Sequence, residues 1–342
     1  MSRSIKNAAP AAKNGPRGLS KRTLLFGAAI GFPASAILLA LSLRSLDTSA
    51  LGDSVRGAHP TALALAVCAS SLVYVVQAAR WRLISQAQPS PSFARFLDWA
   101  IGAVAVNNVV PGRPGDVLRI EWLSRGARMP RTRALASVVV DRGLDLVVLL
   151  AGFALSYSAA AHAKWLDRVG LGALAIAGIG VVLVALVAVF ARRVKPEATS
   201  RLAHVVAEVT REAALRLKGW RGLAAVALSV LAWSIWAISA WFVASSLGLA
   251  LSPMDLLFVT AVINVGVAIP SSPGFIGTYQ WLSVSALSLL GVNHTDAFAF
   301  SVLMHAAWFV PTTLAGAVLI LRKAPPVVAV ALREQPSESN VA

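Results

Sequence analysis

The chain contains few charged residues and a single cysteine. Of its 342 residues, 13% are charged and 57% are hydrophobic, whereas soluble globular proteins carry about 25% charged and roughly 45–50% apolar residues. This shortage of charge excludes a soluble enzyme and an intrinsically disordered protein. The lone cysteine, Cys68, excludes an intramolecular disulfide and a multi-cysteine metal site. The composition therefore indicates a polytopic membrane protein.

The charge that is present has mostly one sign, with a formal net charge of +16. A basic chain can indicate a nucleic-acid-binding protein. Here, however, the basic residues lie between hydrophobic segments, which is the pattern left by membrane topology and by contact with anionic lipids. We therefore expect membrane lipids as partners and no nucleic acid.

Hydrophobic segments of about 17–25 residues can cross a bilayer as helices. Six segments reach that length: 24–43, 61–79, 133–157, 171–191, 223–248 and 297–321. Two shorter segments, 93–110 and 254–269, run into the sequences PGRPG and PSSPG, where proline prevents a helix from continuing. Broken helices at membrane depth persist only inside protein or along a wet cavity. The sequence thus predicts an all-α integral membrane protein with six full spans and two re-entrant helical hairpins.

The basic residues also predict an orientation. With the amino terminus inside, the cytoplasmic segments hold 26 of the 31 Lys and Arg, and none occurs between residues 222 and 321. Such a bias favours cytoplasmic placement of both termini. A basic tail, 1–23, and a second tail, 323–342, then flank one transmembrane domain, 24–322. The first apolar segment exceeds the 7–15 residues of a signal-peptide core, which favours an uncleaved span over a cleaved leader.

The two proline–glycine sequences suggest an internal repeat. The pattern P-x-x-P-G at 111–115 recurs at 270–274, and asparagine precedes it both times. The repeat units would span about 61–157 and 223–321, and three crossings separate the starts of the two units. An odd number of crossings reverses the direction of the chain, so the units would have inverted topology, as in many secondary transporters. Coincidence is the alternative, because proline and glycine are common in membrane helices.

Charged residues around the first motif predict a polar site inside the membrane. A helix that starts near Gly115 would direct its positive end toward the membrane interior, where free backbone amides beside Arg113 could hold a phosphate. Asp116 and Arg119 are spaced to share a helix face. A charge at the bilayer centre costs at least about 2.5–3.5 kcal/mol, so such residues are usually paired or functional.

The following long span adds Asp141, Arg142 and Asp145 at helical spacing. One interpretation is a cavity for a lipid headgroup. The alternative is an ion-pair network that only fixes the hairpin.

Residues 107–119 and 139–145, with 270–277, resemble the flippase-like family. This family is the transmembrane region of lysylphosphatidylglycerol synthases and also occurs as stand-alone bacterial proteins. The resemblance covers roughly residues 25–322. It implies a bacterial plasma-membrane protein that translocates or handles lipids or lipid-linked groups, with no aminoacyl-transfer domain after residue 322.

The chain departs from that family at two positions. The family usually has glutamate where this chain has Gln280, and arginine where it has His305. A charge pair of the second repeat is therefore replaced by a neutral pair. The predicted substrate-binding residues are Asn107, Asn108, Arg113, Gly115, Asp116, Arg119, Asp141, Arg142, Asp145, Asn264, Pro273, Gly274, Gly277, Gln280 and His305.

The sequence favours a lipid transporter for anionic or phosphate headgroups, without catalytic residues, metal or cofactor. Two other classes stay open. One is an integral-membrane transferase or hydrolase that acts on a lipid-linked substrate through Asp116, Asp141 or Asp145 and a metal. The other is a non-catalytic partner of a separate lipid-synthesis enzyme.

Overall fold

The computed structural model describes residues 21–44, 46–111, 113–159, 201–267 and 272–323, which form helices and no strand. In chain order the helices are α1 (Lys21–Leu43), α2 (Thr48–Gly57), α3 (Pro60–Ser85), α4 (Phe93–Val109), α5 (Gly115–Gly126), α6 (Arg131–Ala159), α8 (Arg201–Arg216), α9 (Trp220–Ser246), α10 (Pro253–Gly266), the short 3₁₀ helix η1 (Pro273–Phe275), α11 (Thr278–Leu289) and α12 (His294–Lys323). The prediction of an all-α protein is confirmed.

Several helices begin where their sequence carries a capping signal. α3 starts with Pro60, whose missing N–H is no loss in a first turn. The Ser92 side chain accepts a hydrogen bond from the Arg95 N–H at the start of α4. Ser252 and Asp255 form a reciprocal capping box on α10.

Three helices are long and apolar enough to cross a membrane: Pro60–Ser85, Trp220–Ser246 and His294–Arg322. Residues 32–43 and 48–57 together pass the same test, but they are bent by 89°. The 29-residue helix α6 covers the predicted segment 133–157 and contains Asp141, Arg142 and Asp145, but it is not among the helices that pass this test. The predicted span 171–191 lies outside the described residues, so the number of six spans stays a prediction.

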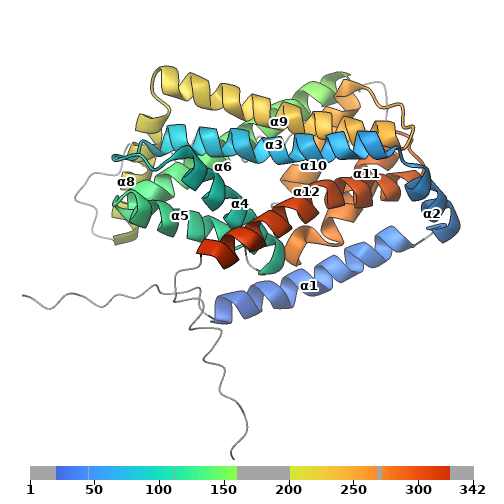
Figure 1. Ribbon diagram of the computed structural model, residues 1–342, viewed down its shortest axis with the longest axis horizontal. Coiled ribbons are helices and arrows are strands. Elements are labelled where there is room, and N and C mark those ends of the chain that lie inside the picture. The colour runs from blue at the N-terminus through green and yellow to red at the C-terminus, as the bar shows by residue number, and fades with distance from the viewer. Residues whose placement is uncertain (1–20, 45, 112, 160–200, 268–271, 324–342) are drawn as a thin grey trace, which may run out of the picture.

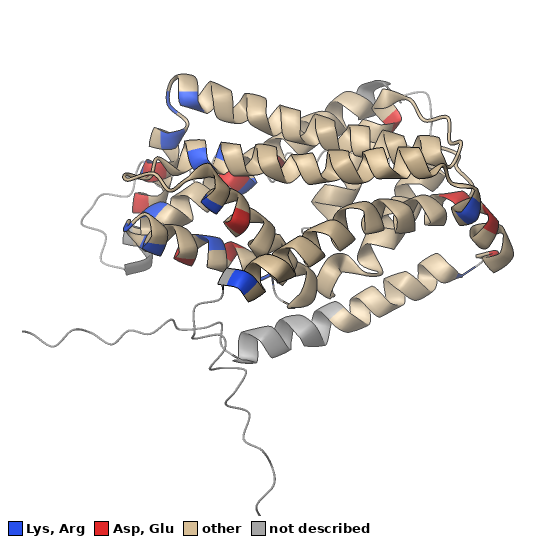
Figure 2. Ribbon diagram, in the orientation of Figure 1, with Lys and Arg blue, Asp and Glu red and all other residues tan. Residues whose placement is uncertain are grey.

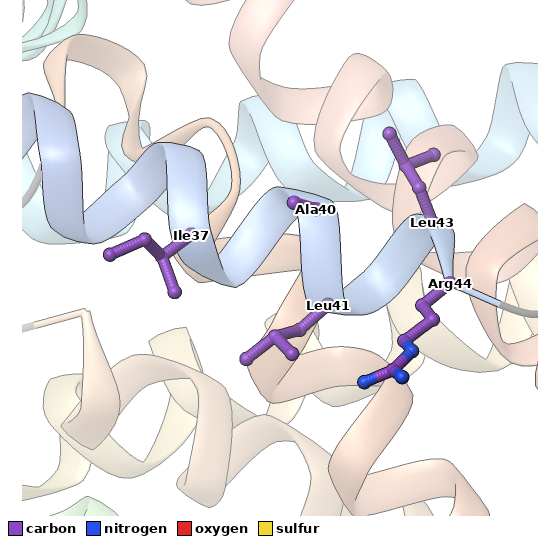
Figure 3. A pocket seen from close by; sticks show the side chains of 5 residues that line it. All are labelled: Ile37, Ala40, Leu41, Leu43 and Arg44. Carbon is purple, nitrogen blue, oxygen red and sulfur yellow. The ribbon is translucent and has the colours of Figure 1, made fainter.

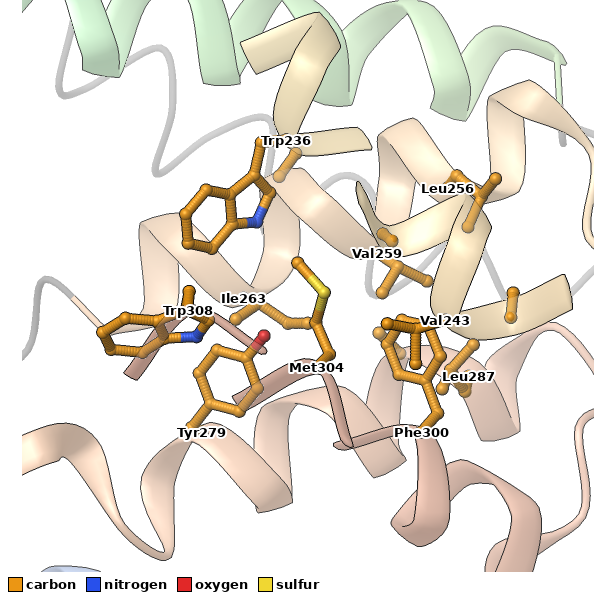
Figure 4. Close-up of a cluster of buried hydrophobic side chains, with 14 of the residues drawn as sticks. Trp236, Val243, Leu256, Val259, Ile263, Tyr279, Leu287, Phe300, Met304 and Trp308 are labelled. Carbon is orange, nitrogen blue, oxygen red and sulfur yellow. The ribbon is translucent and has the colours of Figure 1, made fainter. Parts of the chain in front are cut away.

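The helices pack in three long pairs (Figure 1). α3 lies along α9, and the His59 N–H at one end donates to the Ser246 carbonyl 3.1 Å away, which makes the two helices antiparallel. α4 packs against α12, and α10 packs against α6. Aromatic and aliphatic side chains from α9 to α12 fill the larger core (Figure 4).

The two helices on either side of each proline–glycine sequence pack against each other, as the predicted hairpins require. α5 returns along α4 so closely that a Cβ on Gly115 would lie 2.1 Å from the Ala103 carbonyl oxygen, and one on Gly126 would lie 2.4 Å from the Trp99 ring. α11 likewise returns along α10, where Leu282 contacts Gly266. Because each second arm folds back on the first, the chain turns at both proline–glycine sequences. Whether the turns lie inside a membrane stays a prediction.

Charge and apolar surface are segregated along the molecule. Most of the described Lys, Arg, Asp and Glu lie at the end of the bundle that contains α5 and α8 (Figure 2). At the opposite side, a shallow pocket on α1 is lined by aliphatic residues and one arginine: Ile37, Ala40, Leu41, Leu43 and Arg44 (Figure 3). An exposed aliphatic face of this kind suits contact with lipid tails.

Candidate functional site

The centre of the site is an arginine that joins two aspartates of α6 to α3. The Arg80 side chain is fully buried; its Nε donates to Asp141 Oδ1 at 2.9 Å and its Nη1 donates to Asp145 Oδ1 at 2.7 Å. Nη1 also lies 2.8 Å from Ser229 Oγ, and the Trp233 indole N–H donates to Asp145 at 3.0 Å. Both carboxylates are thus compensated by hydrogen bonds from two other helices, as buried charges must be.

Arg119 extends this network into the first hairpin. Its Nη2 donates to Asp141 Oδ2 at 2.7 Å, and its Nη1 lies 3.6 Å from Asp116 Oδ1. The guanidinium also lies 4.2 Å from the centroid of the buried Trp81 ring, in cation–π geometry. Arg119 is therefore a buried connector between α5, α6 and α3.

The accessible part of the network is the pair formed by Arg142 and Asp116. Arg142 Nη2 lies 2.8 Å from Asp116 Oδ1, and the two side chains are 42% and 30% exposed. The contact of Arg142 with Asp145 is longer, at 3.4 Å. A ligand that reaches the charged network would therefore meet this pair first.

Arg113 lies at the break between α4 and α5 and is bound differently. It has a positive φ of 54°, and its Nη1 donates to the Val267 carbonyl at 3.0 Å, while its guanidinium lies 5.1 Å from the centroid of the Phe275 ring. No salt bridge joins it to a carboxylate in the described part of the chain. The cluster then contains four arginines and three aspartates, which leaves one positive charge in excess.

The two asparagines before the first motif have structural partners. Asn107 Oδ1 accepts a hydrogen bond from the Gly115 N–H at 2.7 Å. The expectation of a free amide at Gly115 is therefore wrong, because the asparagine of the first arm already caps the second arm. Asn108 Nδ2 donates to Thr313 Oγ1 at 2.8 Å, which ties the hairpin to α12.

The second motif forms a separate, neutral cluster. Gln280 Oε1 accepts from the Gly277 N–H at 2.7 Å, and Gln280 Nε2 lies 2.9 Å from His305 Nδ1. Pro273 begins η1, and Gly274 and Gly277 adopt positive φ values of 65° and 89° that favour glycine.

The remaining predicted residue, Asn264, donates to the Thr260 carbonyl of its own helix at 2.8 Å. It joins neither cluster through a hydrogen bond that we observe.

The two motifs meet in the middle of the bundle. A Cβ on Gly274 would lie 3.2 Å from the Asn108 carbonyl oxygen, and the Arg113 guanidinium reaches the Phe275 ring. Residues 112, 270 and 271 of the two motifs lie outside the described residues. The structure thus places the charged and the neutral cluster next to each other.

Sequence reasoning missed Arg80. Arg80 is absent from the predicted site residues because the predicted span ends at residue 79, whereas α3 continues to Ser85. A signal was available, since no glycine or proline interrupts residues 61–88. Trp233 is also absent from the predicted site residues, although its indole N–H donates to Asp145.

These features define a multi-pass membrane protein whose helical bundle encloses an ionic network beside a broken helix. The chain belongs to the family of the lysylphosphatidylglycerol synthase TM region, whose sequence pattern matches residues 24–316. The resemblance inferred from the two motifs is thereby confirmed.

Two other proteins have sequences similar to this chain. Glycosyltransferase AglD of Haloferax volcanii is 26% identical over 84% of this chain, and the alignment spans only 53% of that protein. UPF0104 membrane protein MJ1595 of Methanocaldococcus jannaschii is 21% identical over 78% of this chain and 86% of its own length. This chain is thus similar to about half of the first relative and to most of the second.

Proposed function

We propose that this protein binds lipids or lipid-linked groups by an anionic phosphate and moves them between the two leaflets. The observation that carries the proposal is the excess positive charge of Arg113, which makes no salt bridge with a described residue and lies within electrostatic range of both members of the accessible Arg142–Asp116 pair. An uncompensated cation in a membrane-embedded bundle is costly. A phosphate oxygen would compensate it, and the lipid tails could stay in the bilayer.

The exposed ion pair offers a way to admit the phosphate. Arg142 is shared between Asp116 at 2.8 Å and Asp145 at 3.4 Å. A phosphate that takes the place of Asp116 on Arg142 would leave the buried part of the network intact, because Arg80 holds Asp141 and Asp145 independently. Binding then requires rearrangement of only the Arg142–Asp116 pair.

Helix pairing supports an inverted repeat. α4 of the first unit packs on α12 of the second, α10 of the second packs on α6 of the first, and the opening helices α3 and α9 pack on each other. This reciprocal exchange is the expected result when two related units with broken helices assemble. The site at the contact of the two motifs corresponds to the interface where such transporters bind substrate.

We infer that both termini face the cytoplasm and that the protein lies in the plasma membrane. The clustering of charged residues at the α5 and α8 end supports this orientation (Figure 2).

The name of the relative from Haloferax volcanii keeps a transferase function as the alternative. Against it, each of the three aspartates is engaged by an arginine, at 2.7–2.9 Å for the closest contacts. A carboxylate paired in this way is a weaker general base than a free one. Transport of the lipid rather than chemistry on it is better supported.

Reconstitution in liposomes tests the proposal. Protein-containing vesicles with a fluorescent anionic phospholipid should expose the inner-leaflet probe to a membrane-impermeant quencher faster than empty vesicles. Arg113→Gln should slow this exchange by roughly ten- to a hundredfold, because a charge-assisted hydrogen bond is worth about 1.5–3 kcal/mol. Arg95→Gln, a change on the exposed face of α4, is the matched control.

A covalently modified lipid in the same vesicles would instead establish the transferase. Absence of both exchange and product would leave the role of a partner for a lipid-synthesis enzyme.

A further inference from the structure

The hydrogen bond between Gln280 and His305 fixes the tautomer of the His305 ring. The Gln280 Oε1 accepts the Gly277 N–H, so the amide NH₂ of the same side chain must be the group that faces His305 Nδ1. Nδ1 then accepts a hydrogen bond and carries no proton. A neutral imidazole therefore has its proton on Nε2, which makes that nitrogen a donor.

That donor belongs to a group of three. His305 Nε2, the Tyr279 hydroxyl and the Trp308 indole nitrogen are all buried, and none makes a hydrogen bond with a described residue. The three side chains are 6%, 2% and 6% exposed. The Trp308 indole lies near the Tyr279 hydroxyl and the His305 ring lies near the Gly274 backbone, but neither contact has the geometry of a hydrogen bond. Buried polar groups are almost always satisfied, so three unsatisfied donors in contact require an explanation.

The rings that carry these donors form one compact cluster. The His305 centroid lies 4.7 Å from that of Tyr279 and 5.1 Å from that of Trp308, and both neighbours stack on it at 26°. The Tyr279 and Trp308 centroids are 6.0 Å apart, and Figure 4 shows the two rings side by side. The donors are thus confined to one place beside the second motif.

The cluster adjoins the proposed phosphate site. The Phe275 ring lies between them, 6.3 Å from the Trp308 centroid and 5.1 Å from the Arg113 guanidinium. A single headgroup whose phosphate contacts Arg113 could therefore place its next atoms near Trp308.

We propose that Tyr279, His305 and Trp308 form a neutral, hydrogen-bond-donating subsite for the uncharged, hydroxyl- or carbonyl-bearing part of a lipid headgroup. The proposal rests on the proposed function, because it assumes that the phosphate of the same lipid is held at Arg113. The subsite would also select among headgroups, because its three hydrogen-bond donors favour headgroups that carry oxygen acceptors.

An ammonium headgroup fits this subsite poorly. It carries only donors, as the subsite does, and it would need a carboxylate or an open aromatic face. The His305 ring already packs against the rings of Tyr279, Trp308 and Phe309. No salt bridge that we observe places a carboxylate at His305, and Gln280 stands where an acidic residue would have supplied one.

Three lipids with the same tails and phosphodiester test the subsite. Phosphatidylglycerol offers hydroxyl groups, phosphatidylmethanol has the same charge without them, and phosphatidylethanolamine offers an ammonium. Native mass spectrometry of the purified full chain should show phosphatidylglycerol bound several-fold to about tenfold tighter than phosphatidylmethanol, the range expected for a neutral hydrogen bond.

Trp308→Phe, Tyr279→Phe and His305→Phe each remove one donor and keep a ring. Each should bring the affinity ratio of the two anionic lipids toward one while phosphatidylmethanol binding is retained, which also shows that the variants are folded. Trp236→Phe is the matched control, since Trp236 packs 6.0 Å from Trp308 but is not among the unsatisfied donors. It should leave the ratio unchanged.

A ratio near one in the unmodified protein, a ratio that survives all three substitutions, or tighter binding of phosphatidylethanolamine would overturn the subsite. Failure of the proposed function has a different signature. In that case Arg113→Gln would leave the affinity for both anionic lipids unchanged, whatever their ratio.

Discussion

Arg80 on α3 donates to Asp145 on α6 across 2.7 Å, although 65 residues separate them in the chain. Both side chains are buried, with Arg80 0% and Asp145 6% exposed, so water cannot replace either partner. Arg80 also donates to Ser229 of α9, and Asp145 accepts from Trp233 of α9, so the same two side chains join the first unit to the second. The charged centre of the protein is therefore built on the helix pair that joins the two halves.

Removing Arg80 should destabilise the protein severely. Arg80→Ala strands two buried carboxylates, and loss of one partner of a buried ion pair costs about 3–5 kcal/mol. Thermal unfolding in detergent should show a large drop in midpoint. Arg82→Ala, a change at the exposed neighbour, should stay within about 0.5 kcal/mol. Equal stability of the two variants would contradict the role assigned to Arg80.

Gly115 should tolerate no side chain. A Cβ there would lie 2.1 Å from the Ala103 carbonyl oxygen and 2.7 Å from Asn107 Oδ1. Gly115→Ala should therefore cost about 1–3 kcal/mol or more, as overpacking does. Gly143→Ala on α6, where nothing lies within 4 Å, should instead stabilise by about 0.5–1 kcal/mol. The unfolding midpoints of the Gly115→Ala and Gly143→Ala variants measure how tightly α5 packs on α4. Unchanged stability of Gly115→Ala would contradict this tight packing.

Arg142 and Arg119 should separate binding from stability. Arg142 pairs with Asp116 where both are partly exposed, so Arg142→Ala should cost no more than about 1 kcal/mol. Its loss should nevertheless weaken lipid binding by roughly ten- to a hundredfold. Arg119 is buried on Asp141 and Trp81, so Arg119→Ala should lower stability by about 3–5 kcal/mol.

The double variant Arg142→Ala with Asp116→Ala tests whether the outer pair is only structural. We expect it to fold and to remain inactive in lipid exchange. Recovery of exchange in this variant would show that the pair is scaffold and that the assigned site is wrong.

The orientation of the hairpin can be measured directly. A reporter fused at residue 126, the end of α5, should be cytoplasmic, and one at residue 252, just before α10, should be extracytoplasmic. The physical reason is that a hairpin returns the chain to its own side, whereas a full crossing does not. An extracytoplasmic signal at residue 126 would refute the re-entrant hairpin and, with it, the inverted repeat.

The sequence alone determined the class of protein and the position of its breaks. Apolar runs of about 20 residues predict helices that can cross a bilayer. The paired prolines of the two P-x-x-P-G sequences made the ends of α4 and α10 predictable, whereas the single Pro311 does not end α12. The i, i+3 and i, i+4 pairs, such as Arg142 with Asp145, were predictable as well, because helical spacing is a local property.

Only the tertiary structure decided which partner each polar group has. Asn107 takes the amide of Gly115, Arg80 takes the two aspartates of α6, and Arg113 is left without a carboxylate among the described residues. Contacts of this kind depend on which helix faces pack together and on the relative position of the two helices along their axes. Helix packing sets those relations across long separations in the chain, so no local pattern encodes them.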